Sequence, residues 1–439
     1  MEHLVKNRTM KDYLIRIFTI LTMFIIVFSV MEINEATNNK NPISKNPKIK
    51  SMTINNETVG GLKGTVEKSK SGTTIYLKKG VYKFNNTDIK IGKTLTIIGK
   101  GSAKDIVIDA RKKDSIFEIN SKGKLTLINV TLTNGKGITG VGISNSGRCY
   151  VYNSVFKDHI SEDGGSGIYN YGKCIVRNSK FKNNYDTYDA VVGSAIHNTG
   201  KLTVTGSKFL NPYGKSILIM NDDGNILVKN NIFRGGDTAV LNTDLYGNNR
   251  FVVLNNVIHR FSDGGICNLY SHSKHIVIKS NKINNCDIGI YSEGSYANIR
   301  FNTVNKVAYG IIFDGNYNII SKNKLTNNKK SPSKKIWSIW QKSGCKYNKI
   351  SNNVVKGFYL GIVTGDGGKY NLILKNKVIK STYGIYVELG HKTNRVSYNT
   401  FLNNKIGLVS NYKFKNKSNI FVGNEVNIKK VNHSKNNIW

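Results

Sequence analysis

Two short patterns of alternating apolar and polar positions recur along the chain. The first places Asn or Ser between apolar residues, as in residues 151–156 (VYNSVF), and its copies follow one another at steps of 21–30 residues. The second begins with a small residue and continues with alternating apolar positions, as in residues 167–170 (GIYN). Each copy has the length of a β-strand, and turn-forming residues separate the copies.

The period of these patterns narrows the choice of fold. Leucine-rich repeats share the period but require a Leu pattern that this chain lacks, and propeller blades need about 40 residues. Short strands without intervening helices favour a coil of parallel strands. We therefore predict an all-β fold, a right-handed parallel β-helix (solenoid) of roughly thirteen coils about 4.8 Å apart, over residues 93–431. An N-terminal cap and the first coil are expected over residues 57–92, with a short amphipathic helix at residues 58–68.

The over-representation of Asn fits this fold. Equivalent positions of consecutive coils stack above one another, so an inward Asn amide donates to one neighbour and accepts from the other. A second such ladder is expected five residues earlier in the late repeats, from Asn318 to Asn419. The main predicted ladder consists of Asn231, Asn256, Asn281, Asn302, Asn323, Asn353, Asn376, Asn399 and Asn424.

Two of the five cysteines share one register. Cys149 and Cys174 are 25 residues apart at the same place in consecutive repeats, so they are expected on adjacent coils. A separation of one coil spacing lies within the range of Cα distances that a disulfide accepts. The pair is therefore either a disulfide or a buried stack of free thiols.

The N-terminus predicts export. A basic flank precedes the apolar residues 17–31, which is typical of a signal peptide or of a short N-terminal membrane anchor within residues 1–33. Residues 34–56 are expected to be a polar linker, and residues 432–439 a polar tail. We expect an extracellular or cell-surface protein whose contact with a membrane is limited to its N-terminal segment.

The start of the repeat region resembles a known superfamily. Residues 74–82 (TIYLKKGVY), 95–99 (LTIIG) and 108–109 (ID) are similar to the opening of pectate-lyase-like right-handed β-helix proteins. With its export signal and its richness in Lys and Asn, the chain resembles the adhesin-like surface proteins of methanogenic archaea. The resemblance extends over residues 58–431 and implies the fold. It leaves the function open, because this fold is found in lyases, hydrolases, epimerases and non-catalytic surface rods.

The resemblance also implies where an active site would lie. Enzymes of the superfamily place acids on the first strand of each coil and on the turn after it, and acids on adjacent coils would stand about 5 Å apart. That distance suits the two carboxylates of a retaining glycosidase, or two acids that share a calcium ion. Calcium is the only metal that the resemblance suggests, and no other cofactor is predicted. Turn-forming Asp-Gly and Glu-Gly pairs also align in columns without any catalytic role. The candidate acids are Asp222, Asp244, Glu293 and Asp314, and the candidate ligand-binding residues are Tyr169, Arg250, His272, Tyr291 and Tyr386.

The charge balance suggests the partner. Lys and Arg number 65 against 27 Asp and Glu, which gives a formal net charge of +38. Such a charge attracts anionic polymers, although compositional bias with a solvated surface would also produce it. No nucleic-acid recognition motif is present, so nucleic acid is disfavoured. We expect a non-catalytic, adhesin-like or envelope rod that binds anionic polysaccharide or cell envelope. The alternative is a polysaccharide lyase or glycoside hydrolase acting on acidic polysaccharide.

Overall fold

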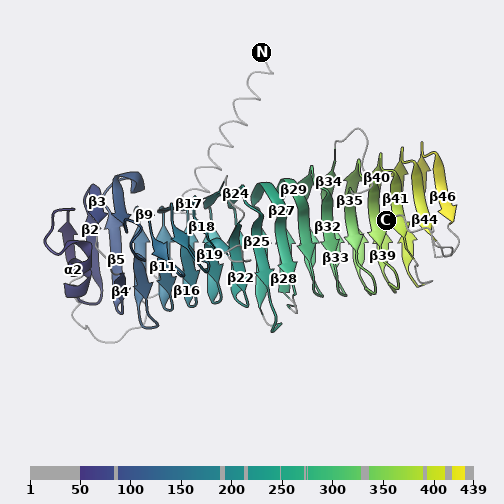
Figure 1. The fold of residues 1–439 in the computed structure, drawn as a ribbon. Helices are drawn as coiled ribbons and strands as arrows, with labels where there is room; N and C mark the ends of the chain where they lie inside the picture. The colour runs from purple at the N-terminus through teal and green to yellow at the C-terminus, as the bar shows by residue number, and fades with distance from the viewer. Residues whose placement is uncertain are drawn as a thin grey trace, which may run out of the picture. The chain divides into compact units, whose positions relative to one another are not determined.

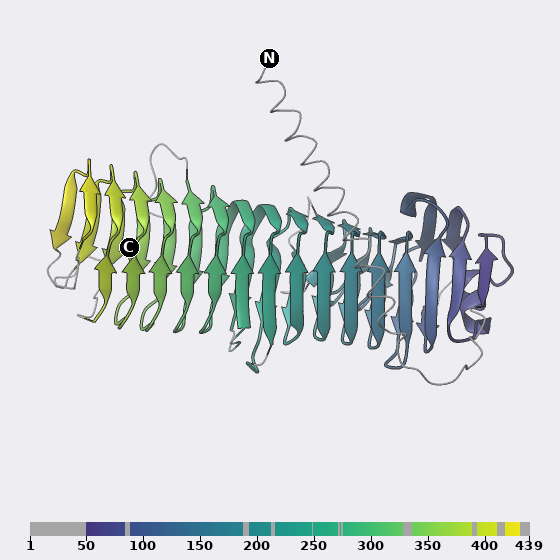
Figure 2. The same ribbon diagram turned by 180° about the vertical axis from the view of Figure 1, so that it is seen from behind.

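The protein is an all-β parallel solenoid of about 14 turns with 57% strand, close to the roughly thirteen coils predicted (Figure 1). The computed structural model describes residues 50–83, 88–187, 193–211, 216–247, 249–270, 273, 275–327, 336–388, 393–410 and 418–430. These residues belong to one compact unit that begins at Ile49. Figure 2 shows from behind that its coils follow one another in sequence order from the N-terminal to the C-terminal end.

Except at the two ends of the solenoid, each coil contributes one strand to each of three parallel stacks. Stack 1 is a 15-stranded sheet, and stacks 2 and 3 form one 28-stranded sheet because two long strands run through both.

Stack 1 contains β1 (Ser51–Ile54), β2 (Thr73–Leu77), β5 (Thr94–Gly99), β8 (Lys124–Ile128), β12 (Arg148–Tyr152), β16 (Lys173–Arg177), β20 (Lys201–Thr205), β23 (Asn225–Lys229), β26 (Arg250–Leu254), β28 (His275–Lys279), β30 (Asn298–Arg300), β33 (Ile319–Ser321), β36 (Lys349–Ser351), β39 (Leu372–Leu374) and β42 (Arg395–Ser397). Stack 2 contains β3 (Gly80–Lys83), β6 (Ile106–Asp109), β9 (Thr131–Thr133), β13 (Val155–Lys157), β17 (Lys180–Lys182), β21 (Lys208–Leu210), β24 (Ile232–Arg234), β31 (Thr303–Asn305), β34 (Lys324–Thr326), β37 (Val354–Lys356), β40 (Lys377–Ile379), β43 (Thr400–Leu402) and β45 (Ile420–Val422). Stack 3 contains β4 (Ile89–Ile91), β7 (Phe117–Ile119), β11 (Ile143–Asn145), β15 (Ile168–Asn170), β19 (Gly193–Asn198), β22 (Ile217–Asp222), β25 (Thr238–Thr243), β32 (Tyr309–Phe313), β35 (Trp337–Gln341), β38 (Leu360–Thr364), β41 (Tyr383–Val387), β44 (Ile406–Ser410) and β46 (Val426–Lys430). The strands that run through stacks 2 and 3 are β27 (Val257–Leu269) and β29 (Lys282–Ser292), and a short side sheet contains β10 (Lys136–Gly137), β14 (Ile160–Ser161) and β18 (Tyr185–Asp186).

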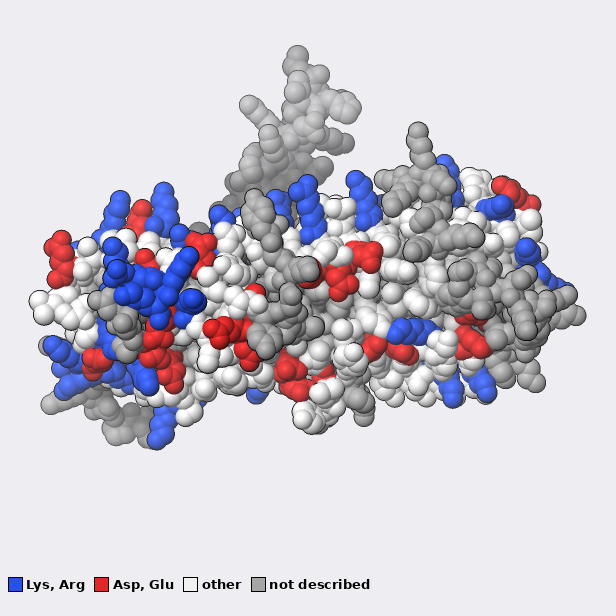
Figure 3. Space-filling view, viewed as in Figure 1, with Lys and Arg blue, Asp and Glu red and all other residues white. Residues whose placement is uncertain are grey.

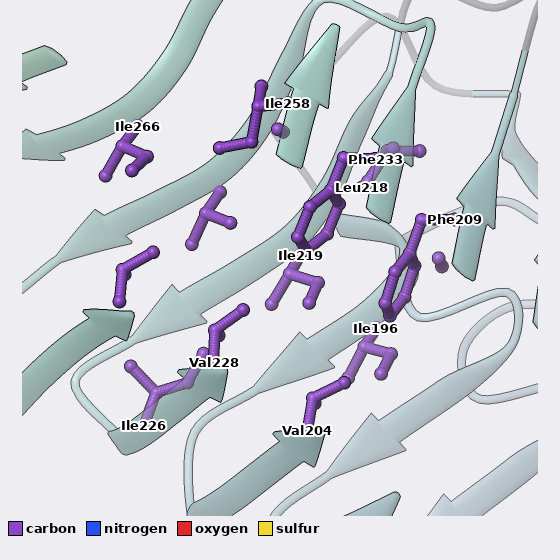
Figure 4. Packing of buried hydrophobic residues seen from close by; sticks show 14 of the residues in the cluster. Ile196, Val204, Phe209, Leu218, Ile219, Ile226, Val228, Phe233, Ile258 and Ile266 are labelled. Carbon is purple, nitrogen blue, oxygen red and sulfur yellow. The ribbon is translucent and has the colours of Figure 1, made fainter. Parts of the chain in front are cut away.

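The core fills the interior of the coils with identical residues stacked in register. Phe156, Phe181, Phe209 and Phe233 lie one above the other in stack 2, with ring centroids 4.7–4.8 Å apart. Figure 4 shows Phe209 and Phe233 together with Ile196 and other buried aliphatic side chains of the neighbouring stacks. Alternation along most strands of stacks 1 and 2 therefore directs one face to the core and the other to solvent, whereas strands of stack 3 such as β19, β38 and β44 bury every residue.

The main Asn ladder is confirmed from Asn231 to Asn399. Each side-chain amide donates to the Oδ1 of the next member at 3.0–3.1 Å. The prediction is wrong for Asn424. Asn399 donates instead to Asn419, 20 residues further on, while Asn424 accepts from Asn404. The last coil is therefore five residues shorter than the sequence suggested, which also removes Asn419 from the second ladder.

A further Asn ladder was not predicted. It lies at the carboxyl ends of strands in stack 3, where amide groups are linked at 2.5–2.6 Å. The signal was present in the sequence, because five of its six members end the small-residue pattern. The ladder consists of Asn145, Asn170, Asn198, Asn221, Asn242 and Asn268.

The N-terminal end is covered by a short helix, as predicted. Helix α2 (Gly61–Lys68) begins three residues later than expected and buries Leu62 and Val66 against the first coil. The polar linker predicted for residues 34–56 ends too late, because β1 lies inside it and pairs with β2. The export segment and the polar tail lie outside the described residues. Among those described, no helix is long and apolar enough to span a membrane.

Candidate functional site

The four candidate acids lie at the carboxyl ends of stack 3 strands, but the first two do not face a common space. Asp222 ends β22 level with Thr243, and its Oδ1 accepts a hydrogen bond from the Thr243 hydroxyl at 2.7 Å. Asp244 is fully buried, and its Oδ1 accepts from the Gly247 amide at 2.8 Å and from Asn249 at 3.2 Å. Asp244 therefore closes a turn and is not accessible to a polymer.

The other two acids belong to a cluster built from three consecutive turns. Tyr291 donates its hydroxyl hydrogen bond to Glu293 Oε1 at 2.5 Å, and the Lys342 ammonium lies 3.5 Å from the same oxygen. Lys342 Nζ also contacts the Tyr291 hydroxyl and lies 4.8 Å from the centroid of its ring. Asp314 Oδ1 accepts from the Gly315 amide at 2.6 Å and from the Cys345 thiol at 3.3 Å. We call Tyr291, Glu293, Asp314, Lys342 and Cys345 the Lys342 cluster.

The electrostatics of the Lys342 cluster favour a closed ion pair. Burial would raise the pKa of Glu293, but hydrogen bonds from Tyr291 and Tyr270 and the charge of Lys342 outweigh it and lower that pKa. Burial would lower the pKa of Lys342, but the contact with Tyr291 and the charges of Glu293 and Asp314 raise it. Burial and the bond to Glu293 raise the pKa of Tyr291. At neutral pH Glu293 is thus a carboxylate, Lys342 an ammonium and Tyr291 a neutral phenol. Each of these groups can form hydrogen bonds with a ligand, but none is a strong base free to accept a proton.

The other predicted ligand-binding residues are dispersed. Tyr169 stacks on Tyr171 and His197, with ring centroids 4.5 and 4.4 Å away. Tyr386 lies far along stack 3 beside Tyr383, with centroids 6.3 Å apart. Arg250 begins β26 in stack 1, and His272 lies outside the described residues. Within the portion of the chain that the structure describes, no group of three or more His, Cys, Asp or Glu is placed to hold a metal ion.

A column of five cations on stack 1 was not predicted from the sequence. Four of them are exposed, while Lys124 is half-buried with its ammonium 5.3 Å from the centroid of the Tyr150 ring. Lys124, Arg148, Lys173 and Lys201 begin consecutive strands and pair directly in register. Asn225 occupies the next coil, and its side chain accepts a hydrogen bond from the amide of Arg250, the following cation. We call Lys124, Arg148, Lys173, Lys201 and Arg250 the cationic column.

The cationic column is not neutralised by acids. No ion pair among the described residues includes any of its members. Like charges directly opposite each other on neighbouring strands repel, so the column costs stability and produces a positive field along one line. The sequence signal was a cation directly before Cys149, before Cys174 and before Leu202.

Beside the column lies a shallow cleft. It has a volume of about 260 Å³, is lined by Lys173, Lys201 and Arg250, and has a floor that includes Ile175 and Leu227. Figure 3 shows one face of the molecule, on which Asp and Glu gather along the middle and most Lys and Arg lie at the margins and at the N-terminal end.

The Cys149–Cys174 register is confirmed, and both thiols are free and fully buried. The hydrogen bond with Cys174 and burial hold the pKa of the Cys149 thiol well above its ordinary value. Because all five cysteines are buried, we predict that the folded protein reacts very slowly with a thiol-specific disulfide reagent. In denaturant without reductant, five thiols per chain should react; a count of three would instead indicate a disulfide.

The comparisons with known proteins define the family. The model described as "Right handed beta helix region" matches residues 115–271, 195–355 and 289–438. No curated protein matches the chain. Solved structures with a similar fold include the mannuronan C-5 epimerase AlgE6 A-module of Azotobacter vinelandii, at 12% identity and a TM-score of 0.42, over 84% of this chain and 98% of that one. The surface protein and adhesin PfbA of Streptococcus pneumoniae is similar at 12% identity and a TM-score of 0.43, over 84% and 100% of the two chains.

Enzymes and an adhesin thus stand side by side among the similar structures, and at this identity they share only the fold. The matched residues span most of the chain, and the stacked coils agree with the family description. The protein belongs to the right-handed beta-helix family.

Proposed function

We propose that this protein is an exported, cell-surface β-helix rod that binds anionic glycans without cleaving them. The observation that carries the proposal is the cationic column, whose positive charges, four of the five exposed, are aligned on stack 1 and make no ion pair with acids among the described residues. The apolar segment near the N-terminus supports export.

The spacing of the charges suits a linear polymer. Lys124, Arg148, Lys173 and Lys201 recur at about 4.8 Å, and Arg250 follows two coil spacings beyond Lys201 because Asn225 lies between them. Cations in such a line can meet charges of an extended chain lying along the solenoid axis. The apolar floor of the adjacent cleft, which includes Ile175 and Leu227, offers contact to the less polar faces of sugar rings. An acidic polysaccharide carries both features, repeated anionic groups and rings with apolar faces.

Removing three cations from the column should weaken glycan binding about 10- to 100-fold, at roughly 0.5–0.9 kcal/mol for each exposed charge contact. The test variant is Lys173→Gln/Lys201→Gln/Arg250→Gln, assayed for binding to polygalacturonate across a range of salt concentrations. The slope of log affinity against log salt should also fall by about one for each cation removed.

The matched control makes the same change in charge on stack 2. Lys324→Gln/Lys356→Gln/Lys377→Gln removes three exposed lysines that make no ion pair among the described residues. Its affinity and salt slope should stay close to those of the unmodified protein. An equal loss in both variants would mean that only net charge matters, and the cationic column would not be the binding surface.

The second candidate function is a polysaccharide lyase or glycoside hydrolase, which the Lys342 cluster favours. Its ammonium and phenol are proton donors, held half-buried beside two acids. Because Lys342 and Glu293 are already paired, we expect neither new reducing ends nor unsaturated uronates from the same polymer. If the unmodified protein forms such products and the Lys342→Gln variant does not, the protein is an enzyme, and the proposal of binding without cleavage is wrong.

A further inference from the structure

Four tyrosines form a continuous stack on the surface of the late coils. Tyr296, Tyr317, Tyr347 and Tyr370 lie on consecutive coils, with neighbouring ring centroids 5.1, 4.9 and 5.0 Å apart. The ring planes are parallel to within 6°. Each residue is 46–50% exposed, so solvent reaches every ring of the stack. We call these four residues the tyrosine stack.

The second Asn ladder fixes the position of the tyrosine stack. An inward Asn directly follows three of the tyrosines, Tyr317, Tyr347 and Tyr370. These Asn residues are fixed because the backbone amide of each donates to the Oδ1 of the next member of the ladder, at 2.7–2.9 Å. All four tyrosines have positive φ angles of 58–63°. That conformation is unfavourable for a bulky residue, so the turn imposes it, and parallel ring contacts offset some of the cost.

The arrangement limits what the stack can bind. Because neighbouring rings cover each other's faces, the exposed portions are mainly ring edges and hydroxyl groups. A sugar ring needs an open aromatic face to stack on, and only the two end rings can offer one. The stack is therefore poorly suited to bind sugars along its length, and its distinctive chemical property is an unbroken run of four phenol rings about 5 Å apart.

We propose that the tyrosine stack is a site of oxidative cross-linking, at which a haem peroxidase with hydrogen peroxide joins tyrosines of adjacent coils. Each of two neighbouring phenols loses one electron and one proton, which gives two tyrosyl radicals. The radicals combine through ortho carbons to form one carbon–carbon bond, and each ring regains aromaticity when its ortho hydrogen moves to oxygen. One hydrogen peroxide takes up the two electrons and two protons and leaves as two waters.

Proximity favours coupling between neighbours in the stack over coupling to isolated tyrosines. A radical on Tyr317 has phenol partners about 5 Å away on both sides, so coupling does not wait for an encounter between chains. Tyr246, at 79% exposure, and Tyr185, at 41%, are also accessible to an oxidant but contact no aromatic ring among the described residues. All five cysteines, which would reduce a tyrosyl radical, are buried.

The test oxidises the full chain at low concentration with horseradish peroxidase and hydrogen peroxide, followed by protease digestion and mass spectrometry of the monomeric fraction. We expect peptide pairs lighter by two hydrogens that join adjacent members of the tyrosine stack. Tyr317→Phe/Tyr347→Phe keeps the stacked rings but removes the two central phenols, so these cross-linked peptides should be lost.

The control variant is Tyr185→Phe/Tyr246→Phe, which should leave the yield of cross-linked peptides unchanged. Cross-links that involve Tyr185 or Tyr246 as often as the tyrosine stack would overturn the proposal. So would cross-links that persist in Tyr317→Phe/Tyr347→Phe, or dityrosine found only between chains. The outcome does not depend on glycan binding, because no step involves the cationic column.

Discussion

Replacement of Asn302 by Leu is expected to lower the free energy of unfolding by about 4 kcal/mol. Asn302 is fully buried, and its Oδ1 accepts from the backbone amide and side-chain amide of Asn281 at 2.9 and 3.1 Å. Its own amide donates to the Ile278 carbonyl at 2.9 Å and to Asn323 at 3.0 Å. Leucine has a similar size but leaves several buried polar groups unpaired, each at about 1–3 kcal/mol.

The measurement is urea denaturation followed by circular dichroism, with Asn305→Leu as the control. Asn305 lies in β31 of the same coil but is half-exposed and outside the ladders, so its replacement should change stability by less than about 0.5 kcal/mol. If the two variants lose similar stability, the loss reflects the residue change in general and the ladder does not hold the coils together.

Acid should destabilise the protein through His159. The ring is fully buried, and burial lowers the pKa of His159 to about 3, against roughly 6.5 in the unfolded chain. Below pH 6.5 the unfolded chain takes up a proton that the folded protein excludes. Stability is therefore present above pH 6.5 and falls by about 1.4 kcal/mol per pH unit, to a total loss of roughly 5 kcal/mol near pH 3.

His159→Asn should remove this component without breaking the fold. His159 Nδ1 accepts from the Gly135 amide at 2.9 Å, a bond that an Asn oxygen can replace. Asn184 makes the equivalent bond on the next coil, since its Oδ1 accepts from the His159 amide at 3.4 Å. Urea midpoints measured from pH 7 to pH 4 should fall less steeply for the variant than for the unmodified protein. Parallel curves would mean that His159 is protonated or solvated when folded.

The periodicity of the sequence predicts most of the fold because every coil must satisfy the same buried polar positions and fill the same apolar interior. An inward polar turn position needs a partner above and below, which is why the ladder from Asn231 to Asn399 is readable in the sequence. The shift at Asn424 was not predictable, since it depends on the length of a single turn. Asn occurs at two positions five residues apart in the late coils. The sequence therefore predicts which Asn pairs with which only where consecutive coils have the expected length.

The candidate sites were harder to predict because they depend on neighbours from different coils. Glu293 and Asp314 were identified as acids on adjacent coils, but Lys342, which pairs with Glu293, comes from a turn one coil further on. The cationic column was readable in principle, since Arg148 and Lys173 directly precede the two cysteines whose register was recognised. The register that aligns the two inward cysteines also aligns the outward cation that precedes each of them. A cation at this same position in five strands is the signal that identifies the column.

The direction of the hydrogen bonds between coils has a mechanical consequence. Strands of each stack are bonded to the strands above and below, so these bonds run along the rod and each coil contacts mainly its two neighbours. Tension applied to the two ends would peel the coils away singly, and each freed coil of 20–30 residues would add roughly 70–100 Å of chain. A tether of this kind lengthens in steps under load instead of failing at once.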